Sequence, residues 1–412
     1  MAQTVANLAD VMKEVFTSDR LEKQFFDQQD TLAELQRTSK FTIGKKAVVP
    51  IHKGRSGGYS VKSSAGGALN SADEQKVDRA EYTVPYNYHQ IEIEIAALNE
   101  AHGGAFSVGT ALGLEVEGAI ADIRNQVERQ FVSNGDSLVA GCLAGAANTT
   151  ILLDPAEYGS DAISRGWLYE GLQIDIGTTA NEVAVGDGVT ITAVTESDTA
   201  PTLTVDSSVT ETANDYVSIK DARSGTTSNE SSGLRTMFGS TTSAVGGLDP
   251  DNAGESFWKP AHVDTTTTVL SLDLLLTMQR KVQQKGGKPQ TRVLSSLKQQ
   301  ASFYSLLQSQ VRFQGEMKVG AGAVNRTVWN GLEWEAMNAI PDQEVYFLTP
   351  EDLAVVTGAR FKQPTWVSSL QGANQGLIWK QGNTSFVDAI AYPVALALKR
   401  RNRAAAAIGL TA

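Results

Sequence analysis

The sequence feature that most constrains the fold is the stretch 106–134, where apolar side chains recur at steps of three and four residues. Such steps place them in one stripe along a helix, with charged residues such as Glu128 and Arg129 on the other faces. The stripe consists of Leu112, Val116, Ala119, Ile120, Ile123, Val127 and Phe131. Ser107 is placed to cap this helix and Gly135 to end it. We therefore predict a helix roughly 40 Å long that braces the surface of a domain.

Length and composition are typical of a folded chain of two or three domains. The chain has 412 residues, of which 41% are hydrophobic and 20% are charged. No run of about 18 apolar residues occurs, and the N-terminal segment lacks the basic and apolar regions of a secretory signal. The single cysteine, Cys142, lies in a Gly/Ala-rich stretch that favours a buried side chain over a reactive thiol. We expect no membrane partner and an intracellular site of folding.

The negative charge is concentrated in one part of the chain. The formal net charge is −11, and the stretch 166–219 contains no Lys or Arg. Its acidic residues are Glu170, Asp175, Glu182, Asp187, Glu196, Asp198, Asp206, Glu211 and Asp215. A module with this charge repels nucleic acid and favours solubility, so we expect it to face solvent.

Two segments before the long helix depend on partners. Residues 1–40 read as an arm with a broken helical stripe, too short to bury its apolar side chains alone. Residues 41–97 read as two long strands, FTIGKKAVVPIH and EYTVPYNYHQIEIEIAALN, joined by a Gly/Ser/Ala-rich loop of about thirty residues. Tyr59 and Val61 alternate within this loop, which indicates a two-stranded flap. Such a ribbon is marginally stable alone and needs a surface to lie on.

The region after the long helix alternates between β and α patterns. Residues 168–233 contain short runs such as VTITAV and TLTV between turn signals, which predicts a small inserted antiparallel β-domain. Helical stripes follow at 268–285 and 297–313, then short strands. The last stretch has strand-like alternation and a basic cluster, Lys399, Arg400, Arg401 and Arg403.

Enzymatic chemistry is not indicated. The histidines are scattered, and no metal-binding, phosphate-cradling or dinucleotide motif occurs. Gly135 begins a lipase-like GDSL tetrapeptide, but its Ser137 follows a helix rather than a strand and no paired Asp-x-x-His follows. The stretch 249–254 begins like a calcium loop but has Ala253 at a ligand position. We predict no catalytic residue, metal or cofactor, and a solvated strand end for the basic cluster, with DNA contact as the alternative.

The order of these elements resembles the major capsid proteins of tailed bacteriophages, which have the Hong Kong 97 fold. Four segments carry the resemblance: GKKAVVPIHKGRSGGYSV with EYTVPYNYHQIEIEIAALNE, LGLEVEGAIADIRNQVERQFVSNG, LLLTMQRKVQQKGGKPQTRVLSSLKQQASFYSLLQS and SFVDAIAYPVALALKRRNRAAAAIGL. They match the extended loop with its return strand, the spine helix, the axial domain and the closing strand. The resemblance lies in order and pattern and covers most of the chain.

The resemblance implies an α+β capsid fold with a definite division of the chain. The expected parts are an N-terminal arm (1–40), an extended loop with flanking strands (41–97), the spine helix of the peripheral domain (98–150), an axial domain (151–167 and 234–375), the inserted β-domain (168–233) and a C-terminal strand segment (376–412).

The function implied by the resemblance is structural. Copies would form hexamers and pentamers and close an icosahedral shell around double-stranded DNA, assembling in the host cytoplasm and remaining in the virion capsid. A portal and a separate scaffolding protein are implied, with a decoration protein as a further possible partner. The extended loop would lie over a neighbouring subunit, and its expected contact residues are Lys53, Arg55, Tyr59, Val61 and Lys62; no covalent cross-link is assigned.

Two other functions stay open at this point. The same fold forms non-viral nanocompartment shells that enclose enzyme cargo. The Thr-rich β insertion also fits a surface-binding or adhesion module, although no secretory signal accompanies it.

Overall fold

The computed structural model describes most of the chain, which has an α+β fold. The described residues are 37–38, 42–43, 46–54, 59–61, 71, 74–94, 108–145, 148–266, 268–286, 292–308, 327–358, 363–367, 378–379 and 385–411. The arm at 1–36 and the cap residue Ser107 lie outside them. Contacts between Cα atoms divide the chain into two units. Val84–Glu128 and Thr357–Val394 belong to the first, and Arg129–Val356 and Ala395–Ala412 to the second, together with the hairpin described below.

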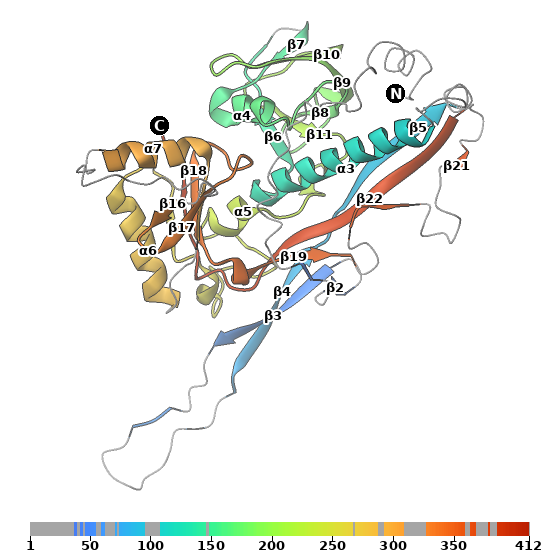
Figure 1. The fold of residues 1–412 in the computed structure, drawn as a ribbon. Coiled ribbons are helices and arrows are strands. Elements are labelled where there is room, and N and C mark those ends of the chain that lie inside the picture. Colours follow the sequence, from blue (N-terminus) through green and yellow to red (C-terminus); the bar gives the residue numbers. More distant parts are fainter. Residues whose placement is uncertain are drawn as a thin grey trace. The chain divides into compact units, whose positions relative to one another are not determined.

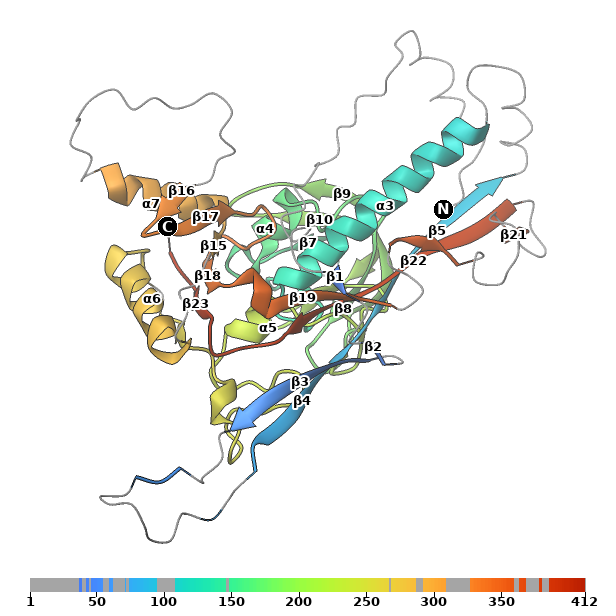
Figure 2. The same cartoon turned by 60° about the horizontal axis from the view of Figure 1, so that its bottom comes forward.

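The first unit combines the long helix with a sheet. Its elements are α3 (Val108–Val132), which ends in the second unit, β5 (Tyr86–Glu94), β20 (Thr365–Trp366), β21 (Ile378–Trp379) and the first part of β22 (Ser385–Leu398). β5 and β22 are antiparallel from Ser385↔Glu94 to Pro393↔Tyr86. α3 runs along this pair of strands (Figures 1 and 2). Ile91 and Ile93 are buried while Glu92 and Glu94 are partly exposed, which confirms the period of two.

The predicted stripe of α3 is confirmed for most of its described side chains. Ala119, Ile123, Val127 and Phe131 are buried, and Val116 and Ile120 are half-buried. The helix ends at Val132, and Gly135 then adopts the left-handed conformation at φ 68°, as expected of a helix stop.

The last turn of α3 differs from the prediction, because Glu128 and Arg129 are buried rather than on a polar face. Arg129 is 1% exposed and its guanidinium forms an ion pair with Glu230. A buried charge is tolerated only with such a partner, and Glu230 is a hundred residues away in sequence, so the helical period could not reveal it.

The predicted hairpin is confirmed as β3 (Lys46–Gly54) and β4 (Lys76–Thr83), paired from Lys46↔Thr83 to Gly54↔Lys76, with the short β2 (Thr42–Ile43) beside β3. The predicted second arm is divided, since β4 ends before Val84-Pro85 and β5 pairs with β22 instead. Proline has no N–H to continue the ladder, which fits a break at this point.

An antiparallel sheet forms the acidic module, in the order β6-β11-β8-β9-β10-β7. Its strands are β6 (Leu138–Gly141), β7 (Asn148–Leu152), β8 (Gln173–Gly177), β9 (Gly186–Thr195), β10 (Thr202–Val209) and β11 (Tyr216–Ile219). The sheet therefore begins at Leu138, earlier than the 168 expected for the inserted domain. β6 has Gly and Ala where a strand usually has branched residues, and it gains its pairing from β11.

Short elements accompany the sheet. η2 (Pro155–Glu157) and α4 (Gly159–Ser164) lie between β7 and β8. The ribbon β12 (Arg223–Ser224) with β13 (Thr227–Ser228) and the helix α5 (Leu234–Phe238) follow β11.

A second sheet of this unit, β14-β23-β18-β15-β17-β16, packs against two helices. The strands are β14 (His262–Asp264), β15 (Arg292–Ser295), β16 (Thr327–Trp329), β17 (Leu332–Ala336), β18 (Glu344–Leu348) and β23 (Ala405–Ile408). The helices are α6 (Leu272–Gly286) and α7 (Leu297–Gln308), which confirm helices at the two predicted positions. Their apolar stripes are confirmed only in part, since Leu276 and Leu297 are more than half exposed. The buried side chains of both helices share one core with the sheet, where Phe303 stacks on Trp334 at 4.3 Å.

Three further elements complete the second unit. They are η3 (Ser256–Trp258), η4 (Pro350–Asp352) and β19 (Leu353–Thr357), whose pairing with β1 (Arg37–Thr38) is parallel.

Candidate functional site

The β3–β4 hairpin is fixed to the loop 245–255 near the outer end of its ladder. The Lys53 ammonium donates to Asp78 Oδ2 at 3.0 Å and to Glu255 Oε1 at 3.2 Å. These hydrogen bonds raise the pKa of Lys53, and the bond from Lys53 lowers the pKa of Asp78. The structure thus places Lys53, expected in a contact between subunits, in a contact within the chain.

Close backbone approach strengthens this attachment. The Glu81 N–H donates to the Gly246 carbonyl at 2.8 Å. A Cβ at Gly246, where φ is 62°, would lie 2.9 Å from the Ala80 Cβ, so only glycine fits there. The Tyr82 hydroxyl donates to the Leu398 carbonyl, and burial raises its pKa. The hairpin therefore leaves the second unit from a fixed base.

The outer part of the hairpin exposes apolar side chains. Tyr59 is 82% exposed, Val61 77% and Val77 72%. Arg55 and Lys62, the other expected contact residues of this loop, lie outside the described residues. Exposed aromatic and branched side chains on a ribbon fit a surface that a partner covers.

The basic cluster contains two kinds of residue. Arg401 is fully buried and donates to the carbonyls of Met237 (2.6 Å), Ser240 (2.8 Å) and Ser243 (2.8 Å). Burial lowers its pKa to about 10. The predicted solvated position of Arg401 is therefore wrong, and so is the alternative that Arg401 contacts DNA, because its guanidinium has its partners inside the protein.

Lys399, Arg400 and Arg403 line a cavity of about 770 Å³, and the buried Arg401 forms part of the same wall. Its other walls come from β3, η3, η4 and the end of α6. Asp352 lies among the cationic groups, with Arg400 Nε and Arg403 Nη1 each 3.9 Å from its carboxylate. Burial raises the pKa of Asp352, and the nearby Arg403 and Arg400 partly oppose this shift.

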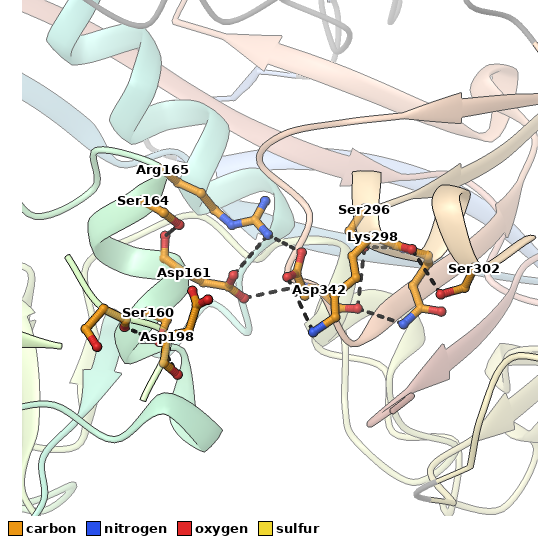
Figure 3. Close-up of polar contacts among 11 residues, drawn as sticks. Ser160, Asp161, Ser164, Arg165, Asp198, Ser296, Lys298, Ser302 and Asp342 are labelled. Carbon is orange, nitrogen blue, oxygen red and sulfur yellow. Dashed lines mark hydrogen bonds and ion pairs between the residues drawn. The ribbon is translucent and has the colours of Figure 1, made fainter. Parts of the chain in front are cut away.

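Hydrogen bonds and ion pairs among Asp161, Arg165 and Asp342 connect α4 and the residue after it with the loop before β18 (Figure 3). Arg165 Nη2 contacts Asp161 Oδ1 at 3.1 Å and Asp342 Oδ1 at 2.8 Å. The Asp342 N–H donates to Asp161 Oδ2 at 3.2 Å, and its carbonyl accepts from the Gln299 side chain of α7. The acidic module and the α7 side of the second sheet are thereby tied together through side chains that are distant in sequence.

A fully buried carboxyl group, Glu344, lies near Asp161 and Arg165. It accepts from the hydroxyls of Tyr346 (2.6 Å) and Tyr158 (3.3 Å), and Arg235 Nη1 lies 3.4 Å away. Burial raises the pKa of Glu344 to about 7, and Arg235 opposes this shift. Its apolar-looking strand context, EVYFL, gave no sign of this network in the sequence.

Known structures identify the fold, although no protein-family model and no curated protein matches the chain. A chain of the cyanophage A-1(L) capsid asymmetric unit is 10% identical, with 96% of both chains covered and a TM-score of 0.58. A chain from the capsid of a native GTA particle is 10% identical, with full coverage of both chains and a TM-score of 0.52. The empty GTA particle gives 9% identity, 97% and 95% coverage, and a TM-score of 0.50.

The chain has the tailed-phage major capsid fold. Since the match spans nearly the whole of both chains, the hairpin, α3 and both units belong to one capsid-fold chain.

The residues that resembled catalytic or metal-binding motifs in the sequence form contacts inside this capsid fold. Ser137 is buried at φ 62°, and its hydroxyl lies 2.8 Å from the Ala222 carbonyl, to which it donates. Cys142 is buried, and desolvation raises the pKa of its thiol to about 12. In the stretch 249–254, Asp251 pairs with Lys259.

Two further findings concern the described residues of the capsid-fold chain. They contain no group of three or more His, Cys, Asp or Glu side chains that could hold a metal ion. None of their helices is long and apolar enough to cross a membrane.

Proposed function

We propose that the chain is the structural subunit of a closed capsid shell that assembles from copies of itself. The observation that carries the proposal is the fold shared over 96% of both chains with the cyanophage capsid subunit. At finer detail, the subunits form hexamers and pentamers of an icosahedral shell that encloses double-stranded DNA. The protein folds and assembles in the host cytoplasm and performs no catalysis.

The hairpin supplies a contact between subunits. Tyr59 and Val61 are almost fully exposed on it, and an apolar ribbon of this kind is stabilised by lying on a neighbour. The anchored base, with Lys53 held by Asp78 and Glu255, aims the hairpin outward at a low entropic cost. We therefore assign Tyr59 and Val61 to the interface, and Lys53 to positioning the hairpin.

Other partners follow from the same proposal. A portal and a separate scaffolding protein act during assembly, and the acidic module is the place for a decoration protein. For Lys399, Arg400 and Arg403, contact with the enclosed DNA is the alternative to contact with a second copy of the chain.

The test is assembly of the purified chain, alone and with a candidate scaffolding protein, followed by light scattering and negative-stain electron microscopy. We expect closed particles. A monodisperse monomer under every condition would contradict the proposal and favour a binding module. Particles that contain enzyme cargo rather than nuclease-protected DNA would indicate a nanocompartment shell.

A shortened hairpin provides the matched variant. Gly54 and Lys76 are paired, so an Asn-Gly turn can replace 55–75 without disturbing the ladder. We expect this variant to have the circular dichroism and unfolding midpoint of the unaltered subunit but to form no shells. Normal shells from it would exclude the hairpin as an assembly element.

A further inference from the structure

The cavity beside the turn 399–403 carries an excess of positive charge. Five cationic side chains line it, from Lys285, Lys399, Arg400, Arg401 and Arg403, against the two carboxylates of Glu351 and Asp352. Arg401 is engaged with backbone carbonyls, which are neutral, so its charge is not compensated by them. A cavity with this balance attracts an anionic group.

Two of the cationic groups are held loosely enough to bind a second anion. Arg400 and Arg403 lie 3.9 Å from Asp352, beyond hydrogen-bonding distance. The Arg400 side chain is 54% exposed. Asp352 is 91% buried, yet its Oδ2 has no hydrogen-bond partner in the described structure. The cavity therefore presents cationic donors together with an unsatisfied acceptor.

This combination distinguishes an acidic peptide from nucleic acid. A phosphate backbone supplies acceptors alone, so it would leave the Asp352 oxygen without a donor. A peptide supplies carboxylates for Arg400 and Arg403 and also main-chain N–H groups for Asp352. The chemistry of the cavity thus favours a peptide segment that carries carboxylates.

The turn between β9 and β10 has this chemistry. Glu196 and Asp198 are both exposed and two residues apart, and in the described residues neither carboxylate takes part in an ion pair. The turn is fixed from behind, since Ser160 donates to the carbonyls of Ser197 and Asp198 (Figure 3) and Ser197 Oγ accepts from Ala200 N.

Several other carboxylates of the module are less suited to this role, and the exposed Glu170 and Asp187 are far apart in sequence. Asp175, Asp206 and Asp215 already accept backbone hydrogen bonds. The turn at 196–198 is therefore the best presented pair of negative charges in the acidic stretch.

We propose that the cavity binds the β9–β10 turn of a second copy of this chain, with Glu196 and Asp198 of the partner subunit against Arg400 and Arg403. The inference rests on the proposed shell function. Because the two surfaces differ, the contact is heterologous, and such contacts generate rings or extended lattices rather than isolated dimers. Opposite charges also speed the encounter of copies and make it sensitive to salt.

The first experiment is cross-linking with a carbodiimide, which condenses an amine with a carboxylate in contact, with loss of water. Shells are assembled from an equal mixture of isotope-labelled and unlabelled chains. We expect amide bonds from Lys399 or Lys285 to Glu196 or Asp198 that join a labelled to an unlabelled peptide. Free monomers should not form them.

The second experiment reverses the charges. Arg400→Glu with Arg403→Glu, or Glu196→Arg with Asp198→Arg, should each raise the concentration needed for assembly by about tenfold. All four changes on one chain should restore assembly, because the pairing is rebuilt with opposite sign. Glu170→Arg with Asp187→Arg alters exposed carboxylates elsewhere on the module and serves as the matched control. Circular dichroism of each monomer establishes that it is folded.

The outcomes separate this contact from the proposed function. Shells that form without the cross-link, or that tolerate both reversals, overturn the contact and leave the shell proposal standing. If the Arg400 and Arg403 changes spare assembly and reduce only DNA retention, the cavity belongs to DNA and the inference is wrong. If the unaltered chain forms no shells under any condition, both proposals fail.

Discussion

Arg400 and Arg401 are adjacent in the sequence, yet their side chains have opposite environments. Arg401 is fully buried and donates to three backbone carbonyls, whereas the Arg400 side chain is 54% exposed at the cavity. A guanidinium has five N–H donors in a fixed plane, so it can satisfy several carbonyls that a turn leaves unpaired. Arg401 is therefore part of the interior that supports the cavity.

The two arginines should respond differently to truncation. Arg401→Ala leaves buried carbonyls without donors, and we expect it to lower the free energy of unfolding by roughly 3 kcal/mol or more. Arg400→Ala should change it by no more than about 0.5 kcal/mol. Urea unfolding of the monomers measures both. Equal, small effects would contradict the assignment of Arg401 to the interior.

Glu344 gives the stability a dependence on pH. Its pKa in the folded chain is about 7, above its ordinary value of 4.5, so the folded state binds a proton that the unfolded state releases. The free energy of unfolding should therefore fall as pH rises from about 4.5 to about 7, by up to about 3 kcal/mol, and then level off. Glu344→Gln keeps a group able to accept from Tyr346 and should remove this slope.

Unfolding midpoints at pH 5 and pH 8 test this expectation. The exposed Glu170→Gln is the control and should retain the slope of the unaltered chain. A Glu344→Gln variant with the same slope would show that another group is responsible.

At the scale of elements, the attachment of the hairpin depends on a few contacts around Lys53. Asp78 and Glu255 both accept from its ammonium, and the Glu81 N–H bonds to the Gly246 carbonyl nearby. Lys53 is 22% exposed, so water and salt weaken the pairs only partly. The segment that holds the hairpin is thus distinct from the segment that would contact a neighbour.

Removing the ammonium should loosen the base of the hairpin without unfolding it. In Lys53→Met, we expect amide hydrogen exchange of β4, including Glu81, to rise by roughly tenfold, since about 1.4 kcal/mol of local stability changes an opening equilibrium by that factor. Lys46→Met removes an exposed pair with Glu81 on the same hairpin and should leave the exchange rates nearly unchanged. Equal rates in the Lys53 variant would mean that backbone contacts alone fix the hairpin.

Helices and strands whose apolar residues recur at a regular spacing could be predicted from the sequence. The strands and side chains with which they pair could not. Burial of one face of a helix or strand places apolar residues at regular steps within a short stretch of sequence. The stripes of α3 and α6 and the alternation around Ile91 are such patterns. That β5 pairs with β22, or that β6 and β7 join the acidic module, depends on residues far away in sequence. The ion pair between Arg129 and Glu230 could not be predicted for the same reason.

The candidate site shows the same division. Tyr59 and Val61 were selected because their alternation in a long loop is visible in the sequence; the structure shows that both are exposed, and their contact with a neighbouring subunit stays a prediction. The basic cluster was also visible, but only the structure shows that Arg401 is buried and bonded to backbone carbonyls while the Arg400 side chain is exposed at the cavity.

On the scale of the whole molecule, the features suited to contacts between copies lie on different segments. The acidic stretch carries Glu196 and Asp198, the turn 399–403 lines a basic cavity, and the hairpin exposes Tyr59 and Val61. Contacts between unlike surfaces let each copy bind several neighbours at once, which a closed shell requires. Ionic contacts weaken with salt, whereas apolar burial does not, so the two kinds of contact can be separated experimentally.

The apolar part of this assembly can be tested at the hairpin. Fully burying a large apolar side chain contributes about 1.5–3 kcal/mol, so Tyr59→Ser with Val61→Ser should raise the concentration needed for assembly by at least about tenfold. The effect should persist in high salt, because it does not depend on charge. Val183→Ser, at a 39% exposed apolar residue of the acidic module, is the matched control. Light scattering against protein concentration measures the threshold, and an unchanged threshold in the hairpin variant would remove Tyr59 and Val61 from the interface.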